Sequence, residues 1–375
     1  MLHVPADLGD NGDHRQHTPG GKMPKVDLVY STLKGYSSLF PLFEHLRDRN
    51  WDVALTKVHK HGFRNRELLR RITDTVILAY DQPLYRLEKS GWSGRFIYIE
   101  HGLSPVKYYT YKYEFFHRAA LLFYPGEVFQ RKMKAVNPGF KHGLLGGYPK
   151  VDELLRMDVD REALCRELSL DSAAPVILFA PSWGGKRNKN AGVHNARHLQ
   201  GIRNLLVIPH SADYGHAGKY GAVIPEDGNI NSYLHLADVV VSDVSSVLAE
   251  ASILGKPVVQ IRLTSYPGCF PEEDRRKQGI WISEEVLKKE EEQTDRSQRP
   301  FKIAYLDEDW DFGNSAPPEG LPEAVRKAIE SPDEYETTQR YWAEQSCWKA
   351  DGKTCSRISA MIQRFLETGD LNQLD

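Results

Sequence analysis

Residues 239–262, with the sequence VVVSDVSSVLAEASILGKPVVQIR, constrain the fold more than any other part of the chain. Val239 to Val241 form a β-branched run, which is typical of a parallel strand buried on both faces. Ser245 and Ser246 come where the next helix should begin, so backbone N–H groups and two hydroxyls would face the strand's carboxyl end. Because ligands of open α/β sheets bind at that edge, the stretch indicates an anion site. A serine-capped helix without a ligand remains the alternative.

The helix after Ser246 carries a carboxylate in its second turn. Glu250 lies seven residues after Asp243 in the sequence. Helical spacing puts Glu250 on the same side as Ser246, within reach of a sugar attached to a bound phosphate.

Composition limits the classes of function. The 375 residues favour two or three domains, and 49 basic and 51 acidic side chains leave a net charge of −2. The net charge of the protein is therefore too small to attract nucleic acid or an anionic membrane. No apolar run approaches the roughly 18 residues that cross a bilayer, and no signal-peptide pattern opens the chain. We expect a soluble protein, or at most a peripheral one.

Motifs of several enzyme classes are missing from the sequence. There is no Gly-x-Gly-x-x-Gly after a strand, no His-Glu-x-x-His and no Gly-x-Ser-x-Gly. Gly352-Lys353-Thr354 lacks the upstream glycine and the strand–loop–helix context of a phosphate loop. The cysteines show no zinc-binding spacing and are interpreted as reduced thiols of a cytoplasmic protein, with a disulfide between Cys347 and Cys355 less favoured. These cysteines are Cys165, Cys269, Cys347 and Cys355.

Strands and helices alternate from Pro24 onward, which predicts mostly parallel, doubly wound sheets. Strands are expected at residues 26–33, 51–58, 75–80, 95–102 and 119–125, and again at 175–182, 204–211, 221–226, 238–243 and 257–262. The clearest helices are expected at 39–49, 64–72, 128–135, 229–237 and 246–254.

This alternation divides the chain into two Rossmann-like domains with a join near 157–174. Residues 1–23 are expected to form a disordered tail, with Met23 as the native start. The first domain would span 24–160 and the second 161–320. Residues 321–375 would form C-terminal helices, of which at least one crosses back to the first domain. The carboxyl ends of the strands would then face a central cleft.

Candidate site residues follow the predicted strands. A histidine side chain has an ordinary pKa near neutrality, so His101, which precedes Gly102, is suited to act as a general base. His210 ends a strand at the corresponding position of the second domain. Either histidine could instead bond a loop carbonyl. Ser182 opens a turn with Gly184-Gly185-Lys186, which could also be a plain loop. Lys150 and Asp152 stand at the head of a helix, where Asp152 serves as an N-terminal charge.

Six short motifs in this order resemble the CDP-glycerol glycerophosphotransferase family, the teichoic-acid and capsule polymerases and primases with a GT-B fold. The motifs are His101-Gly102, GYPKVD (147–152), APSW (180–183), Pro209-His210, the stretch from Ala237 to Val247, and Lys256-Pro257. The family typically has Thr, Arg, Asn, Thr, Tyr and Asp where this chain has Leu103, Lys150, Val151, Ser182, Val244 and Glu250. The Glu250 region also resembles nucleotide-sugar GT-B enzymes and UDP-GlcNAc 2-epimerases.

The resemblance implies a transferase that moves glycerol phosphate, or a related group, from a CDP-linked donor to a polysaccharide or lipid-linked acceptor. Glu250 would then hold the ribose. Ser245, Ser246, Ser182 and Lys150 would bind the donor phosphates together with a charged His210, while Asp243 and Gly102 would shape the site. His101 would remove the acceptor proton. No metal is required, although a loosely held Mg²⁺ would be compatible.

Two other classes of function remain open from the sequence. A nucleotide-sugar epimerase would use the same cleft on free UDP-sugars without an acceptor, and a non-catalytic nucleotide-binding partner would bind CDP without turnover. The expected location is the cytoplasm, with peripheral attachment at the inner face of the cell membrane as an option. No nucleic-acid partner is expected.

Overall fold

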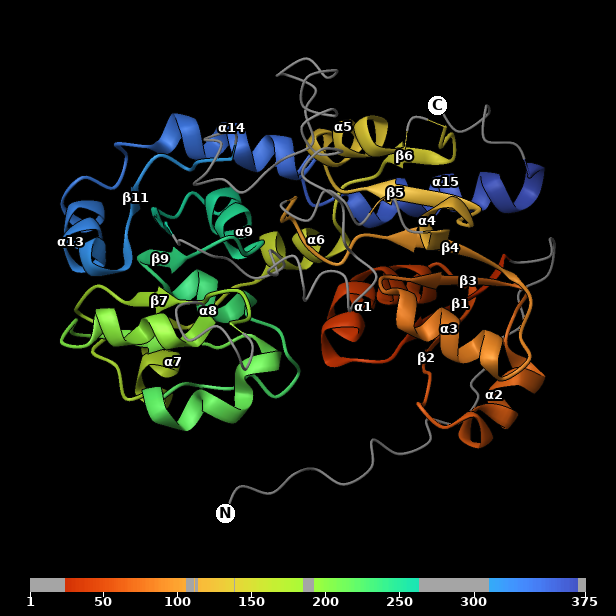
Figure 1. Ribbon diagram of the computed structural model, residues 1–375, viewed down its shortest axis with the longest axis horizontal. Coiled ribbons are helices and arrows are strands. Elements are labelled where there is room, and N and C mark those ends of the chain that lie inside the picture. Colours follow the sequence, from red (N-terminus) through yellow and green to blue (C-terminus); the bar gives the residue numbers. More distant parts are fainter. Residues whose placement is uncertain are drawn as a thin grey trace, which may run out of the picture.

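Two parallel β-sheets, each flanked by helices, form the two halves of the molecule (Figure 1). The computed structural model describes residues 24–105, 111, 114–137, 139–184, 192–262 and 310–369. The predicted tail, Cys269, Gly185-Lys186 and residues 283–309 lie outside the described residues. The sheets confirm the predicted α/β class with two doubly wound units.

The first sheet has the strand order β2-β1-β3-β4-β5-β6 with parallel pairing, so the winding reverses between β1 and β3. Ligands of such sheets bind beside this reversal, outside the carboxyl ends of the strands. The strands are β1 (Lys25–Tyr30), β2 (Asp52–Lys57), β3 (Thr75–Leu78), β4 (Arg95–Ile99), β5 (Leu121–Tyr124) and β6 (Gly143–Leu145). The helices are α1 (Leu33–Asp48), η1 (Gly62–Asn65), α2 (Arg66–Arg71), α3 (Asp81–Lys89), α4 (Glu114–His117), α5 (Glu127–Val136) and α6 (Pro149–Arg156).

The second sheet has the order β11-β10-β9-β7-β8, again parallel, with its reversal between β7 and β9. Its strands are β7 (Ile177–Phe179), β8 (Leu205–Val207), β9 (Val239–Ser242), β10 (Val258–Ile261) and β11 (Ser315–Ala316). Its helices are α7 (Arg161–Glu167), η3 (Gly192–Leu199), η4 (Ser211–Tyr220), α8 (Asn231–Leu236), α9 (Val247–Ile253), η6 (Pro318–Gly320) and α13 (Leu321–Glu330).

One predicted strand is absent, and several others end earlier than predicted. Residues 221–226 form no strand: the Val223 N–H donates to the Val207 carbonyl at 2.9 Å, but Pro225 then has no N–H with which to extend a ladder. The first strand ends at Tyr30 rather than at Leu33. It stops there because the Thr32 hydroxyl accepts a hydrogen bond from the Gly35 N–H at 3.1 Å and caps α1.

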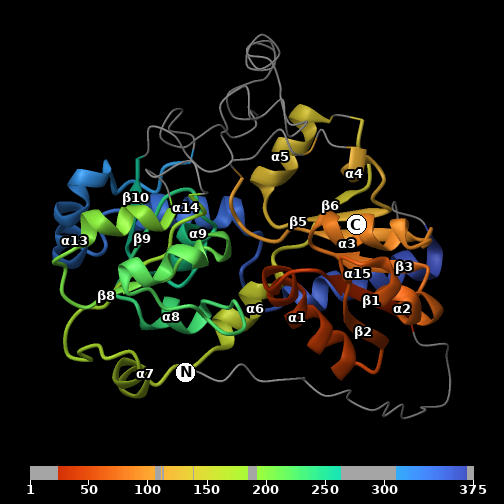
Figure 2. The same ribbon diagram turned by 60° about the horizontal axis from the view of Figure 1, so that its bottom comes forward.

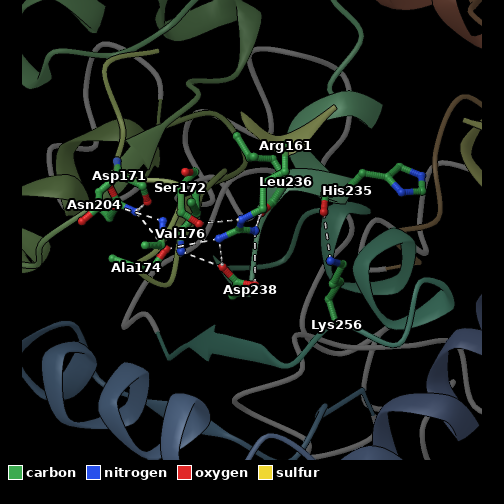
Figure 3. Close-up of polar contacts among 11 residues, drawn as sticks. Arg161, Asp171, Ser172, Ala174, Val176, Asn204, His235, Leu236, Asp238 and Lys256 are labelled. Carbon is green, nitrogen blue, oxygen red and sulfur yellow. Dashed lines mark hydrogen bonds and ion pairs between the residues drawn. The ribbon is translucent and has the colours of Figure 1, made fainter. Parts of the chain in front are cut away.

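The join between the domains contains α7, which Arg161 fastens to the second sheet (Figure 3). Its guanidinium donates to the carboxylate of Asp238 and to three backbone carbonyls, those of Ser172, Ala174 and Leu236. Asp238 also accepts a hydrogen bond from the Val176 N–H at 2.8 Å, just before β7. Arg161 therefore helps to hold the start of the second domain in place.

The C-terminal helix α15 (Thr354–Thr368) covers one face of the first sheet beside α1. Ile358, Ile362 and Phe365 recur at helical spacing and pack in one apolar cluster with Leu39 and Leu42 of α1. Before it, α14 (Glu336–Ser346) lies against both α9 and α5. In the described part of the chain, no helix combines the length and apolar character needed to cross a bilayer.

Asp152 fixes the start of α15. Its carboxylate accepts hydrogen bonds from the backbone N–H groups of Thr354 at 2.9 Å and Cys355 at 2.7 Å. Asp152 lies in the first turn of α6, as predicted, but these bonds go to a different helix. The turn Gly352-Lys353-Thr354 thus meets an internal carboxylate where a phosphate loop would meet a ligand.

The described cysteines, Cys165, Cys347 and Cys355, are buried free thiols. Burial raises the pKa of the Cys347 thiol to about 12, so it stays protonated at neutral pH. No disulfide joins Cys347 to Cys355.

Candidate active site

The carboxyl ends of both sheets border a cleft that contains two adjoining cavities of about 380 and 100 Å³. Five residues line both cavities: Lys34, His101, His210, Ser245 and Ser246. Helix α6 lies between the two sheets in both views of the molecule (Figures 1 and 2). The fold therefore brings both predicted histidines and both predicted serines to one place.

His101 follows β4, with one residue between, and its ring stacks on Tyr80 with a centroid distance of 4.1 Å. The imidazole side chain is 35% exposed, but Nδ1 is shut off from solvent. A ligand in the cleft can therefore exchange a proton only with Nε2. The backbone carbonyl of His101 accepts hydrogen bonds from Tyr148 at 3.1 Å and Ser38 at 3.5 Å, which fix the turn.

Glu100 lies directly behind His101 and was missed by the sequence analysis. Its Oε2 is 3.9 Å from His101 Nδ1, and its carboxylate accepts hydrogen bonds from the hydroxyls of Tyr98 and Tyr111. Burial raises the pKa of Glu100, although the nearby Lys132 ammonium and the tyrosine hydroxyls act in the opposite direction. Its position next to His101 at a strand end is the signal that could have singled it out.

The loops after β4 and β9 touch across the cleft. A Cβ atom on Gly102 would stand 3.3 Å from Ser246 Oγ and 3.4 Å from Ser246 Cβ, so glycine permits this close approach. The Ser104 hydroxyl donates to the Val244 carbonyl at 2.5 Å. The two domains are therefore in contact next to His101.

Asp243 ties together the loops after β7 and β9, the strands that flank the reversal of the second sheet. It accepts hydrogen bonds from the Ser182 N–H and hydroxyl, both at 2.8 Å, and from the Val244 N–H at 2.7 Å. Complete burial raises the pKa of Asp243, whereas the hydrogen bonds from Ser182 lower it. The Ser182 hydroxyl therefore donates its hydrogen to Asp243, so it could bind a ligand only as a hydrogen-bond acceptor.

Ser245 and Ser246 lie half-buried between Asp243 and α9. Ser246 occupies the N-cap position of α9 without a side-chain capping bond, and the Ser245 hydroxyl accepts a long hydrogen bond of 3.4 Å from the Val247 N–H. Both hydroxyls line the two cavities, so they are placed to contact a ligand.

A backbone hydrogen bond at Nδ1 of His210 makes Nε2 the nitrogen that carries the proton. Its Nδ1 accepts from the Ala212 N–H at 3.1 Å and caps η4. Because an accepting nitrogen carries no proton, Nε2 carries it, and the ring in this arrangement is neutral. The charged His210 expected from the sequence would lose this cap.

Lys150 and Glu250 meet between the domains. Lys150 Nζ lies 3.7 Å from Glu250 Oε2, and both side chains are buried. Both line the smaller cavity together with Ser246. Lys150, which the sequence predicted at a phosphate, is thus paired with Glu250, which the sequence predicted at a ribose.

The residues that the structure describes contain no group of three or more His, Cys, Asp or Glu side chains that could hold a metal ion. The cavities are lined mainly by hydroxyls, histidines, lysines and aromatic rings.

Residues 125–262 match the model of the family described as CDP-glycerol:poly(glycerophosphate) glycerophosphotransferase. Over these residues the chain is similar to that family. The matched range contains Lys150, Ser182, His210 and the whole stretch from Asp243 to Glu250, whereas His101 precedes it. No curated protein sequence matches the chain.

Several solved structures share the fold of this chain. The wall teichoic acid polymerase TagF is similar with a TM-score of 0.60 and 17% identity, over 92% of this chain and 90% of that chain. A UDP-N-acetylglucosamine 2-epimerase is similar with a TM-score of 0.54 and 16% identity, over 94% and 98% of the two chains. The S. aureus MnaA–UDP structure gives 0.53 and 13%, over 92% and 97%. The fold is therefore GT-B, as predicted.

Proposed function

We propose that this cleft transfers glycerol phosphate from CDP-glycerol to a hydroxyl of a cell-surface polysaccharide or lipid-linked acceptor, as in teichoic-acid synthesis. One observation carries the proposal: Gly102 lies against Ser246, which brings the imidazole of His101 and the hydroxyl-lined turn of the second domain to one cavity. The family match supports glycerophosphotransfer, and TagF, which shares the fold, has been soaked with CDPG.

The donor would span the two cavities. Lys150 contacts Oε2 of Glu250, which leaves Oε1 to accept a hydrogen bond from a ribose hydroxyl in the smaller cavity. The diphosphate would lie between Ser245, Ser246 and the Nε2–H of His210. Hydroxyl and imidazole donors stabilise phosphate charge without a metal, and Lys34 adds a cation on the side of the first domain.

The transfer would use His101 as the general base. Nε2 of His101 takes the proton of the acceptor hydroxyl while the oxygen attacks the β-phosphorus. The bond from this phosphorus to the oxygen that bridges the two phosphates then breaks, and CMP leaves with the bonding electrons. The buried Glu100 carboxylate, 3.9 Å from Nδ1, would stabilise the imidazolium that forms.

The decisive experiment incubates the purified chain with CDP-glycerol, CDP-ribitol, CMP-linked acids or UDP-sugars, each with an acceptor, and identifies the released nucleotide. We expect CMP from CDP-glycerol. His101→Ala should lower turnover about 100-fold or more, while CDP binding changes little. His142→Ala is the matched control, because His142 is exposed and precedes β6 at the opposite edge of the sheet. Full turnover by His101→Ala would remove this residue from the mechanism.

The shared fold also favours testing a nucleotide-sugar epimerase, because UDP-N-acetylglucosamine 2-epimerase has the same architecture. An epimerase would interconvert free UDP-sugars with no acceptor present. Tight CDP binding without turnover, unaffected by His101→Ala, would instead indicate a non-catalytic nucleotide-binding protein. Each outcome contradicts the transferase proposal.

A further inference from the structure

Helix α5 carries a lysine on its buried face. Val128, Phe129 and Met133 recur there at helical spacing, and each is 1% exposed or less. Lys132 lies on the same face, three residues after Phe129, and only 3% of its surface is exposed. Lysine is almost never buried to this extent unless its charge is paired. An apolar side chain of similar length would satisfy packing, so the charge itself calls for an explanation.

The ammonium group of Lys132 lies among aromatic rings. Nζ is 4.4 Å from the ring centroid of Tyr111 and 5.7 Å from that of Phe129, both within the range of cation–π contacts. The hydroxyl of the same Tyr111 donates a hydrogen bond to the carboxylate of Glu100. Tyr111 therefore contacts Lys132 with its ring and Glu100 with its hydroxyl.

This chain of contacts leads to the proposed general base. Lys132, Glu100 and His101 all line the larger cavity. Oε2 of Glu100 is 3.9 Å from Nδ1 of His101, and this nitrogen is closed to solvent. Burial raises the pKa of Glu100, and the positive charge of Lys132 is the strongest influence in the opposite direction. The lysine therefore favours the ionised form of the carboxylate behind the imidazole.

The other groups around Glu100 do not supply this charge. Besides His101 and Lys132, the titratable groups that face Glu100 or share its cavity are Lys34, Tyr80, Asp81, Tyr98, Tyr111 and Tyr124. Burial raises the pKa of each of the four tyrosines, so they are neutral at neutral pH. Asp81 is a second carboxylate, and Lys34 also borders the smaller cavity, where the donor phosphates would lie.

We propose that Lys132 is a positioning residue for the general base, because its charge, together with Tyr111, keeps the Glu100 carboxylate ionised behind His101. The inference rests on the proposed function, in which His101 removes the proton of the acceptor hydroxyl. An ionised Glu100 stabilises the imidazolium that forms, whereas a protonated Glu100 does so much less. Lys132 acts here through Glu100 and contacts neither donor nor acceptor.

The pH dependence of kcat/KM for CMP release from CDP-glycerol, measured with acceptor present, tests the proposal. Activity requires a neutral His101 and an ionised Glu100, and removal of a nearby cation raises the pKa of both groups. Lys132→Met should therefore move the acidic limb of the profile up by about one pH unit, which lowers kcat/KM about tenfold at pH 6 and much less above pH 8. Lys132→Arg keeps the charge and should restore the native limb.

Lys134→Met is the matched control. Lys134 lies on the same helix but is exposed, so this variant removes the same charge without changing the surroundings of Glu100. It should reproduce the native profile. Melting temperatures check folding, and Lys132→Met should melt close to the native chain, because methionine replaces a buried lysine stem with an apolar one.

Urea unfolding provides a second measurement that does not require turnover. The folded-state pKa of Glu100 lies above the ordinary 4.5, so the free energy of unfolding falls as pH rises between the two values. In Lys132→Met this fall should extend to higher pH, since the folded-state pKa rises further. Tyr111→Phe, which removes a hydrogen bond to Glu100 but keeps the ring next to Lys132, should act in the same direction. Tyr124→Phe removes a buried hydroxyl from β5 and should not.

The two measurements separate the possible failures. An acidic limb that is the same in Lys132→Met and the native chain, or that moves equally in Lys134→Met, would overturn the proposal. So would a loss of activity that is equal at every pH, because that result is expected of a packing role. Full turnover by His101→Ala would refute the proposed base, whereas the unfolding profiles would still show whether Lys132 keeps Glu100 ionised.

Discussion

Lys150 and Glu250 form a buried ion pair that links α6 of the first domain to α9 of the second. Their charged atoms are 3.7 Å apart, and the side chains are 9% and 4% exposed. A charge buried to this extent is tolerated only when it is paired, so each residue depends on the other.

Removing one partner should therefore be costly. We expect Lys150→Met to lower the free energy of unfolding by about 3–5 kcal/mol, because Glu250 is left buried without its cation. The double variant Lys150→Met/Glu250→Leu should recover most of the loss. Arg203→Met is the control: its pair with Asp171 is solvent-exposed and contributes about 1 kcal/mol or less. Urea unfolding measures all four proteins, and an undiminished loss in the double variant would contradict the argument.

Gly102 should be more important for turnover than for folding. In Gly102→Ala, Ser246 must shift by a few tenths of an ångström or the two loops must separate, because the new Cβ would stand 3.3 Å from its hydroxyl. We expect about a three- to tenfold lower kcat, roughly 1 kcal/mol in the barrier, with little change in Tm. Gly215→Ala is the control, since no atom lies within 4 Å of the added carbon. An unaltered kcat in Gly102→Ala would show that this contact does not position the site.

Glu100 should make stability fall as pH rises. Burial raises its pKa above the ordinary 4.5, so between that value and the folded-state pKa the folded protein holds a proton that the unfolded chain has released. The free energy of unfolding therefore falls with increasing pH across this interval. Glu100→Gln should lack this decrease. Urea unfolding from pH 4 to pH 8 measures it.

The control for Glu100→Gln is Glu127→Gln, at an exposed position in the first turn of α5. It should reproduce the native pH dependence. Glu100→Gln should also lower kcat, because a neutral amide stabilises the imidazolium of His101 less than a carboxylate does. Identical pH profiles of stability in the native chain and Glu100→Gln would refute the assignment.

Arg161 should stabilise the second domain. Arg161→Gln loses hydrogen bonds to the Asp238 carboxylate and to the carbonyls of Ser172, Ala174 and Leu236. We expect the free energy of unfolding to fall by about 1–3 kcal/mol. Arg203→Gln, on a side chain that is 80% exposed, should change it by less than about 1 kcal/mol. Equal effects in chemical denaturation would show that the Arg161 contacts contribute no more than a surface pair.

Much of the architecture could be predicted from local patterns. β-branched runs such as Val239–Val241 mark buried strands, and parallel strands that alternate with helices place their carboxyl-terminal residues at one edge. The prediction at 221–226 failed because this apolar run makes one backbone bond, from Val223 to Val207, and Pro225 has no N–H to extend it.

The site was predictable as a set of positions but not as a set of contacts. His101, His210, Ser245 and Ser246 were found because each follows a strand, and the structure brings them together. Their chemical roles stay predictions. Glu100 was overlooked since its importance comes from burial among Tyr98 and Tyr111.

The sequence alone indicated most of the strands and helices and the polar residues that follow them, because these properties depend mainly on neighbours a few residues apart. Only the tertiary structure decided that Lys150 pairs with Glu250 and that Asp152 caps a helix 202 residues further along. Such pairings depend on which polar groups, distant in the sequence, become buried next to each other. The packing of the two domains decides these pairings, and no short stretch of sequence indicates them.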